Sequence, residues 1–357
     1  MDGVDGVLAQ VSRSGRMQVI CHDFAPFDAP LRAALFDLNT PGEQELHRAA
    51  LAANALSRVY AQVTGRLCAR AGLSAAQVRA IGAHGQTVRH QPQSHDGTGY
   101  TWQIQNPALL AELSGMDVVA DFRNRDLAAG GQGAPLVPAF HQGVFGQPGQ
   151  TVAVLNIGGI SNLSLLGADG SVRGWDCGPG NALMDHWCER HTGAAFDAQG
   201  QWAASGHVRP ALLARWLDTP YLHSPPPKST GRDLFNPSWL TATLDDQAGV
   251  APEDVQATLT EFTAQACARD VRAHAPAASE LVVCGGGALN THLMQRLAEA
   301  LPGVRVVSSD ARGLPALQVE AAAFAWLAFK AVHRETASLP SVTGARGARV
   351  LGAIYPR

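Results

Sequence analysis

The sequence predicts a soluble α/β protein built from two lobes, and three observations support this. With 357 residues, of which 46% are hydrophobic and 16% are charged, the chain can bury more than one core. Short apolar runs with strand character alternate with longer helical patterns. In the second half of the chain the order strand, glycine loop and helix recurs, and this order favours parallel strands joined by helices.

The first lobe is predicted to span residues 1–145. It opens with an apolar strand at 4–11 and continues into a helix at 41–71. In that helix apolar residues recur near helical spacing, at Leu46, Ala50, Ala53, Leu56 and Tyr60. Further strands are expected at 78–83, 101–104 and 117–120. Glycine-rich segments at 130–135 and 146–150 indicate a passage into the second lobe, so we place the boundary near residue 145.

The second lobe is predicted to span residues 146–357. Two apolar runs, 152–155 and 163–166, indicate a hairpin. Helical patterns follow at 182–192, 252–274 and 319–332, and the strands expected between the last two lie at 280–284 and 304–308. The alternation of these strands and helices is typical of a sheet with parallel pairs.

Composition excludes several function classes. The formal net charge is −3, and Lys and Arg form no basic run, so we expect no nucleic-acid partner. No signal peptide or membrane span is predicted, because the longest apolar helical run, 321–329, ends at Lys330. Six cysteines without a CxxC pair indicate a reducing cytoplasm. Cys188 and His191 lack a second pair and are interpreted as packing and surface residues rather than metal ligands.

The segment 152–185 joins a flexible backbone to one carboxylate. Gly158 and Gly159 follow a buried strand, and their missing side chains let backbone N–H groups approach an anion. Asp176 stands at a strand end, before Gly178 to Asn181 and a helix that begins near Ala182. This arrangement suits a phosphate-binding loop with an adjacent base. The alternative interpretation is that both glycine segments are ordinary turns.

Gly285-Gly286-Gly287 also follows an apolar strand and precedes a helix, which is a suitable context for binding a nucleotide. It is not a dinucleotide signature, because Asn290 occupies the position of the third glycine. Lys228-Ser229-Thr230 resembles the end of a Walker loop, but Pro227 stands where that loop requires glycine. We therefore reject a P-loop at this segment.

Two further residues, His84 and Arg125, are candidates for the substrate side. His84 stands at a strand end before a glycine, and Arg125 lies in a charged segment, 121–126, beside a glycine loop. Arginine can bind a carboxylate through two parallel hydrogen bonds. The alternatives are a buried structural imidazole and an internally paired surface cluster. Glu320 is either a first-turn acid favoured by the helix dipole or a second active-site carboxylate. His141 remains ambiguous.

Taken together and in order, these segments resemble the anhydro-N-acetylmuramic acid kinases, of the superfamily that unites acetate and sugar kinases with actin. The resemblance covers nearly the whole chain. Its motifs are 84–87 (HGQT), 121–123 (DFR), 130–141, 156–162, 176–181 with Asp185, 228–232 (KSTGR), 283–287, Glu320 with 324–328 (FAWLA), and 339–345 (LPSVTGA).

The resemblance implies two actin-like (ribonuclease H-like) lobes with a nucleotide cleft between them, ATP with Mg²⁺, and 1,6-anhydro-N-acetylmuramic acid as substrate. Water would open the anhydro ring while O6 takes the γ-phosphate, giving N-acetylmuramate 6-phosphate in peptidoglycan recycling. The protein ligands of the metal stay unknown. The expected partners are the sugar and, as an open question, a second copy of the chain in a homodimer.

The resemblance also implies roles for individual residues. Asp176 would be the general base, and Glu320 would position water or sugar hydroxyls. The substrate side would comprise His84, Arg125, Gly178 and Asn181. The nucleotide side would comprise Gly158 and Gly159 at the phosphates, Gly285, Gly286 and Gly287 at the adenosine, and Asp2, Gly3 and Asp5 from the N-terminal phosphate loop.

The N-terminus departs from the family pattern. The resemblance implies a first strand and phosphate loop of the type GxMSGTSxDGVD, whereas the sequence begins at Met1-Asp2-Gly3-Val4-Asp5. We favour a start site placed too far downstream. The alternatives are a truncated, catalytically weak or inactive sugar-binding homologue, or a related sugar kinase. As written, the chain is expected to bind ATP poorly and to be less stable.

Overall fold

The computed structural model describes residues 3–13, 15–226, 228–231, 234–244 and 249–357. The chain forms two compact units, one of Met1–Val144 with Glu320–Arg357 and the other of Phe145–Val319. The boundary predicted near residue 145 falls where the chain first passes between the units. The second half differs from the prediction, because residues 320–357 join the first unit, where strand β12 (Ala353–Tyr355) pairs with β6 (Val118–Ala120).

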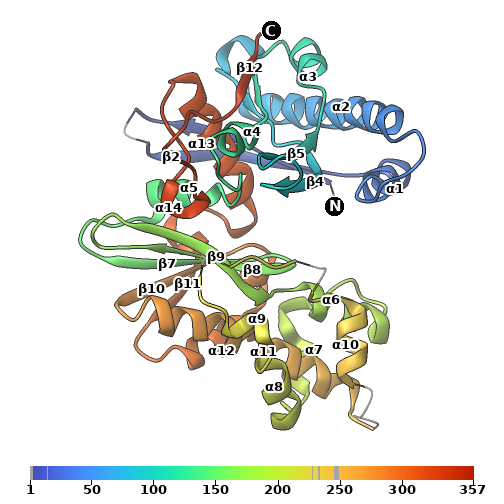
Figure 1. The fold of residues 1–357 in the computed structure, drawn as a ribbon, viewed down its shortest axis with the longest axis vertical. Helices are drawn as coiled ribbons and strands as arrows, with labels where there is room; N and C mark the ends of the chain where they lie inside the picture. Colours follow the sequence, from blue (N-terminus) through green and yellow to red (C-terminus); the bar gives the residue numbers. More distant parts are fainter. Residues whose placement is uncertain (1–2, 14, 227, 232–233, 245–248) are drawn as a thin grey trace. The chain divides into compact units, whose positions relative to one another are not determined.

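Helix α2 (Glu45–Ala71) organises the first unit (Figure 1). It packs against the antiparallel hairpin of β1 (Gly3–Val11) and β2 (Met17–Pro26). Apolar side chains from the helix and the hairpin form one buried cluster: Val4, Ala25, Leu56, Val63 and Leu67. Another part of α2 contributes Ala49, Ala52 and Ala53 to a second cluster with α1 (Ala29–Asp37). One amphipathic helix therefore supports several separate elements of this unit.

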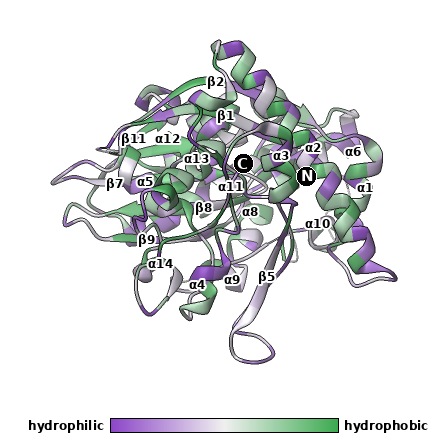
Figure 2. Ribbon diagram, turned by 90° about the horizontal axis from the view of Figure 1, so that it is seen from above, coloured by the Kyte–Doolittle hydropathy of each residue, from purple (hydrophilic) through white to green (hydrophobic). Residues whose placement is uncertain are grey.

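In the described part of the first unit, the strands form three small sheets. Strand β6 lies between β12 and β3 (Ile81–Gly82), antiparallel to the first and parallel to the second. Gly82 is required there, because an added Cβ would lie 2.2 Å from the backbone oxygen of Phe324. Strands β4 (Gln86–Pro92) and β5 (Gly99–Ile104) form a hairpin. Figure 2 shows this hairpin with its polar connecting turn in pale to purple colours.

The remaining elements of the first unit are helical. Helix α3 shows clear end signals, because Asn106 accepts a hydrogen bond from Leu109 N and Gly115 ends the helix in the left-handed conformation. Among the described residues these helical segments are η1 (Ala75–Gln77), α3 (Pro107–Ser114), α4 (Asn124–Ala128), α5 (Val137–Phe145), α13 (Val319–Val332) and α14 (Pro340–Thr343).

The second unit is built on one five-stranded sheet with the order β11-β10-β7-β8-β9. Its strands are β7 (Thr151–Ile157), β8 (Ile160–Leu166), β9 (Val172–Pro179), β10 (Ala278–Cys284) and β11 (Arg305–Ser308). Strands β7, β10 and β11 are parallel, whereas β7, β8 and β9 form an antiparallel meander. The parallel strands place the loops that follow β7 and β10 at the same edge of the sheet.

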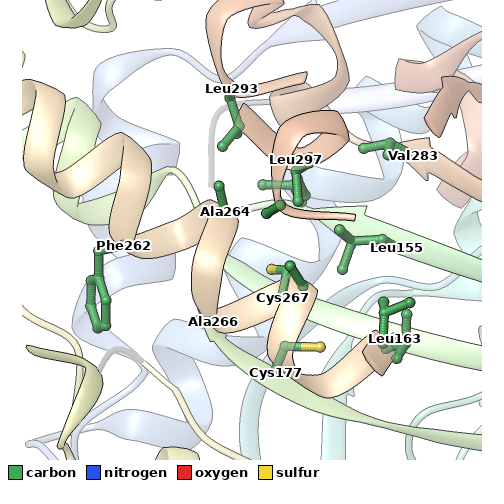
Figure 3. Close-up of a cluster of buried hydrophobic side chains, with 14 of the residues drawn as sticks. Leu155, Leu163, Cys177, Phe262, Ala264, Ala266, Cys267, Val283, Leu293 and Leu297 are labelled. Carbon is green, nitrogen blue, oxygen red and sulfur yellow. The ribbon is translucent and has the colours of Figure 1, made fainter. Parts of the chain in front are cut away.

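Helix α11 (Pro252–His274) forms the centre of the second unit's core. Figure 3 shows Cys267 of this helix beside Cys177 and Leu163 of the sheet, with Ala264 closer to Leu297 of α12 (Thr291–Ala300). The other helical segments are α6 (Ala182–Thr192), η2 (Ala198–Gly200), α7 (Gln201–Ser205), α8 (Pro210–Leu217), α9 (Pro220–His223), α10 (Pro237–Leu244), η3 (Gly286–Leu289), η4 (Ser309–Arg312) and η5 (Ala316–Gln318).

The structure confirms the α/β class and most of the predicted elements. The predicted bounds of α6, α11 and α13 agree with the structure. Strands β2 and β4 and helix α1 were not predicted. Leu46 and Ala50 were placed wrongly on the apolar stripe of α2, since both are exposed, Leu46 by 76% of its surface. Within the described ranges, no helix is both long and apolar enough to cross a bilayer.

Candidate active site

Asp176 lies in β9, an edge strand of the second unit's sheet. Its carboxylate is partly buried, and one oxygen accepts two hydrogen bonds. Ser229 Oγ donates to Oδ2 at 2.8 Å, and Thr230 N donates to the same atom at 3.0 Å. Burial raises the pKa of the Asp176 carboxyl, and the two hydrogen bonds oppose that rise. A carboxylate with a raised pKa is suited to accept a proton near neutral pH.

Lys228 is not presented to a phosphate. Its Nζ lies 3.2 Å from Asp270 Oδ2, and the two side chains are only 4% and 5% exposed. Trp175 Nε1 also donates to Asp270 Oδ2, at 2.8 Å. This buried pair agrees with the rejection of a P-loop, whose lysine must reach the nucleotide.

The Gly158-Gly159 loop is tied to the start of α6. Asn181 N donates to Gly158 O at 2.7 Å, and the amides of Gly180 and Ala182 donate to Gly159 O at 3.0 and 3.2 Å. The side chain of Asn181 does not cap its helix but donates from Nδ2 to Ile157 O, at 3.2 Å. Strand end, glycine loop and helix start therefore form one connected structure.

The second glycine segment lies beside the first. Cys284 is opposite Asn156 in the parallel pair of β10 and β7, so both loops leave the same sheet edge. Gly285 has a φ of +78°, and an added Cβ would lie 2.6 Å from Ile157 O. A Cβ on Gly286 would lie 3.2 Å from Asn181 Nδ2. The structure thus brings together the predicted residues Gly158, Gly159, Asn181, Gly285, Gly286 and Gly287.

Gly180→Ala is expected to destabilise the second unit by about 1–3 kcal/mol, because the added Cβ would lie 2.2 Å from the backbone oxygen of Gly158. Urea denaturation measures the effect. The control is Gly65→Ala in α2, where an added Cβ meets nothing within 4 Å, and it should stabilise by about 0.5–1 kcal/mol. A Gly180→Ala protein as stable as the wild type would contradict the close approach of Gly180 to the backbone of Gly158.

In the first unit the imidazole of His84 forms a hydrogen bond with the guanidinium of Arg123. His84 Nδ1 donates to Gly85 O at 2.9 Å, since a carbonyl can only accept. His84 Nε2 therefore accepts from the guanidinium of Arg123, whose Nη2 lies at 2.9 Å. Burial, together with the charge of Arg123, lowers the pKa of His84 to about 3. His84 is a neutral imidazole with both nitrogens engaged, and it orients Arg123.

Glu320 lies at the first turn of α13, on the same side of the unit as Arg123 and Asp5. Part of Glu320 is exposed to solvent, but desolvation by the surrounding protein raises the pKa of its carboxyl. The positive charge of Arg123 lowers this pKa, and the negative charge of Asp5 raises it. Tyr60 is a further neighbour: its hydroxyl accepts a hydrogen bond from Gly85 N at 3.3 Å, and burial raises its pKa to about 12. The predicted residues His84, Asp5 and Glu320 therefore share one region.

Other predicted residues lie elsewhere. Arg125 is exposed on α4, while Arg123 of the same segment points to His84. Gly178 is buried, and an added Cβ would lie 2.9 Å from a Leu222 methyl group, so it faces apolar core. Gly3 lies in β1, where a Cβ would lie 2.2 Å from Ala25 O. Asp2 lies outside the described residues.

Sequence reasoning missed several contacts. Arg123 appeared only within a motif, and its additional bond from Nη1 to Gly133 O, at 2.9 Å, was not foreseen. Asp126 is fully buried and accepts from Gly133 N at 2.8 Å and Thr343 Oγ1 at 2.9 Å, which fixes the glycine loop. A signal for the contacts of Asp176 was available in Ser229-Thr230, a segment with hydrogen-bond donors that was assessed as a phosphate loop and as a motif of the resemblance but not as a partner of Asp176.

Comparison with known proteins identifies the family. The family model described as anhydro-N-acetylmuramic acid kinase matches residues 1–357. A relative of that name from Variovorax paradoxus is 64% identical, with 100% of this chain and 96% of the relative covered. Another from Albidiferax ferrireducens is 60% identical with the same coverage. The structure of an activator of 2-hydroxyisocaproyl-CoA dehydratase from Clostridium difficile with bound ADPNP is 11% identical. Its TM-score is 0.47, and the match covers 92% of this chain and 91% of that one. The full-length match and the high identity establish that the chain belongs to the anhydro-N-acetylmuramic acid kinase family.

Proposed function

We propose that this protein uses ATP and water to convert 1,6-anhydro-N-acetylmuramic acid into N-acetylmuramate 6-phosphate. Membership of the family supports the substrate and the reaction. The structural observation that carries the proposal is the carboxylate of Asp176, which has a raised pKa and a single oxygen occupied by hydrogen bonds. Such a group is suited to activate a water molecule.

Asp176 would act as the general base. It would remove a proton from the water that attacks the anomeric carbon, as the base of an inverting glycosidase does. The bond from the water oxygen to C1 forms while the bond from C1 to O6 breaks. O6 then forms a bond to the γ-phosphorus, the bond from that phosphorus to the bridging oxygen breaks, and ADP leaves. Alignment of these atoms and neutralisation of charge would supply most of the catalysis.

The remaining residues would bind and orient. In the second unit, the loops of Gly158-Gly159 and Gly285-Gly286-Gly287 would bind the phosphates and the adenosine, with Asn181 holding the loops together. In the first unit, Glu320 would position water or sugar hydroxyls. Arg123, oriented by His84, is better placed beside Glu320 than Arg125 to bind the lactyl carboxylate. The two actin-like lobes and the nucleotide cleft stay a proposal that follows from the family.

Mg²⁺ is proposed as the partner of ATP rather than as a resident metal. Within the described residues no group of three or more His, Cys, Asp and Glu side chains could hold a metal ion. Mg²⁺ commonly binds through substrate phosphates, several waters and only one or two carboxylates. The residues present fit an ion that arrives with the nucleotide, where it would neutralise phosphate charge.

Turnover with defined sugars tests the proposal. The protein is incubated with ATP, Mg²⁺ and 1,6-anhydro-N-acetylmuramic acid, and ADP and the sugar phosphate are measured by coupled assay and mass spectrometry. We expect one ADP for each N-acetylmuramate 6-phosphate and no turnover with glucose or N-acetylglucosamine. Turnover with an ordinary hexose but not with the anhydro sugar would replace the proposal with a different sugar kinase.

We also propose that the protein works in peptidoglycan recycling in the cytoplasm. The support is chemical: anhydromuramic acid is a fragment of peptidoglycan, and all six cysteines are free in the structure. Fractionation of the source cell, followed by detection of the chain in the soluble or the periplasmic fraction, tests the compartment.

A further inference from the structure

One oxygen of the Asp176 carboxylate is held and the other is left open. Both the hydroxyl of Ser229 and the amide of Thr230 donate to Oδ2. Within the described parts of the chain, Oδ1 accepts no hydrogen bond. Two donors on the same atom fix the plane of the carboxylate and leave the lone pairs of Oδ1 for a further proton donor.

The segment that supplies these donors, Lys228–Thr230, is fastened to the second unit at several points, and we call it the base strap. Lys228 O accepts from Asp176 N at 3.1 Å, so the strap is bound to the backbone of the same residue that it holds. From the other side, Tyr221 OH donates to Asp176 O at 2.7 Å. The backbone of Asp176 is thereby held at both its N–H and its C=O.

Lys228 anchors the strap in the core. Its ammonium contacts Asp270 Oδ1 at 3.3 Å and Oδ2 at 3.2 Å, and it lies 5.2 Å from the centre of the Tyr221 ring. Asp270 also accepts from Trp175 Nε1, so a buried network joins the strap to α11 and β9. A buried ion pair with these additional contacts defines one position of the chain.

We propose that the base strap is a positioning element for catalysis: Ser229 and Thr230 hold Asp176 Oδ2 so that Oδ1 takes the proton from the attacking water, and the Lys228–Asp270 pair holds the strap. This inference rests on the proposed function of Asp176. Ser229 and Thr230 need not touch the substrate for this role.

The strap also controls the ionisation of the base. Hydrogen bonds to the charged form of a carboxylate favour that form, so loss of the Ser229 donor should raise the pKa of Asp176. The described titratable groups around Asp176 are Tyr221 on α9, Cys267 and Asp270 on α11, and Lys228 and Cys177. Since a base works when deprotonated, a higher pKa removes activity first at acidic pH.

Ser229→Ala tests the strap directly. Ser229 is exposed, so the variant should fold. The pKa of Asp176 is measured by carbon-13 NMR of labelled aspartate, with the signal assigned through Asp176→Asn, and kcat/KM is measured across pH with the anhydro sugar. We expect a raised pKa, an acidic limb moved to higher pH, and a loss of kcat/KM of about ten-fold at pH 6, which corresponds to one charge-assisted hydrogen bond. Ser229→Thr should restore both values.

The matched control is Ser171→Ala in the β8–β9 turn. There the serine hydroxyl donates to Asp169 Oδ1 at 2.6 Å, so the variant loses the same kind of bond away from the base. It should leave the pKa of Asp176 and the pH profile unchanged. An unchanged pKa of Asp176 in Ser229→Ala would overturn the inference even where the wild type is active. Failure of the wild type to phosphorylate the sugar would instead reject the proposed function, and NMR would still test the strap.

Discussion

Asp176→Asn is expected to remove ring opening, with a loss of about 10²–10⁴ in kcat, the contribution that a positioned general base makes. Asparagine has nearly the same shape, and its amide oxygen can still accept from Ser229 Oγ and Thr230 N. It cannot take a proton from water at neutral pH. The fold and nucleotide binding should therefore remain while the chemical step is lost.

The measurement combines ADP release with calorimetric titration of ADPNP. Asp169→Asn is a matched control, because it neutralises an exposed carboxylate in the β8–β9 turn that also accepts from a serine hydroxyl. Its turnover should equal that of the wild type. Near-normal turnover of Asp176→Asn would overturn the assignment of the base, and loss of nucleotide binding in this variant would assign Asp176 to the nucleotide site.

Lys228→Met is expected to destabilise the second unit by about 3–5 kcal/mol, the typical effect of removing one partner of a buried ion pair. Methionine fills a similar volume but leaves the carboxylate of Asp270, which is 5% exposed, without its cation. Trp175 Nε1 would remain its neighbour at 2.8 Å, and one neutral donor does not replace a charge.

Tryptophan fluorescence during urea denaturation can follow this change, because five of the seven tryptophans lie in the second unit: Trp175, Trp187, Trp202, Trp216 and Trp239. Lys330→Met is the control, since its partner Glu335 is 45% exposed and such a pair contributes under about 1 kcal/mol. The double variant Lys228→Met with Asp270→Asn should recover part of the loss. If Lys228→Met were as stable as the control Lys330→Met, the buried Lys228–Asp270 pair would not be an anchor.

Elements with strong local patterns could be predicted from the sequence. Helix α11 begins with Pro252 and acidic residues and runs for several turns, and its predicted bounds agree with the structure. Strand β2 was missed because Val19, Ile20 and Cys21 are consecutive apolar residues, so the sequence lacks the apolar and polar alternation that burial shows along most of Met17–Pro26. Helix α1 was missed although Asp28 caps it, accepting from Leu31 N at 2.8 Å. Short elements with mixed burial carry too little periodicity to be recognised.

What the sequence determined by itself was the α/β class, the family resemblance, and the positions of Asp176 and of both glycine loops. The two glycine loops directly follow β7 and β10, and the end of a strand in such a fold is where a ligand-binding loop begins, whereas Asp176 lies within β9 rather than at its end. Only the tertiary structure decided which hydrogen-bond partners these site residues have. Ser229 lies 53 positions from Asp176, and Arg123 lies 39 positions from His84.

The same limit applies to the division into units. Residues 320–357 join the first unit through the pairing of β12 with β6, and nothing local to either strand encodes that choice. The physical reason is that a hydrogen-bond donor or a strand edge can be satisfied by many partners of the right type. Which partner it meets depends on how all the intervening elements pack, and local sequence patterns do not contain that information.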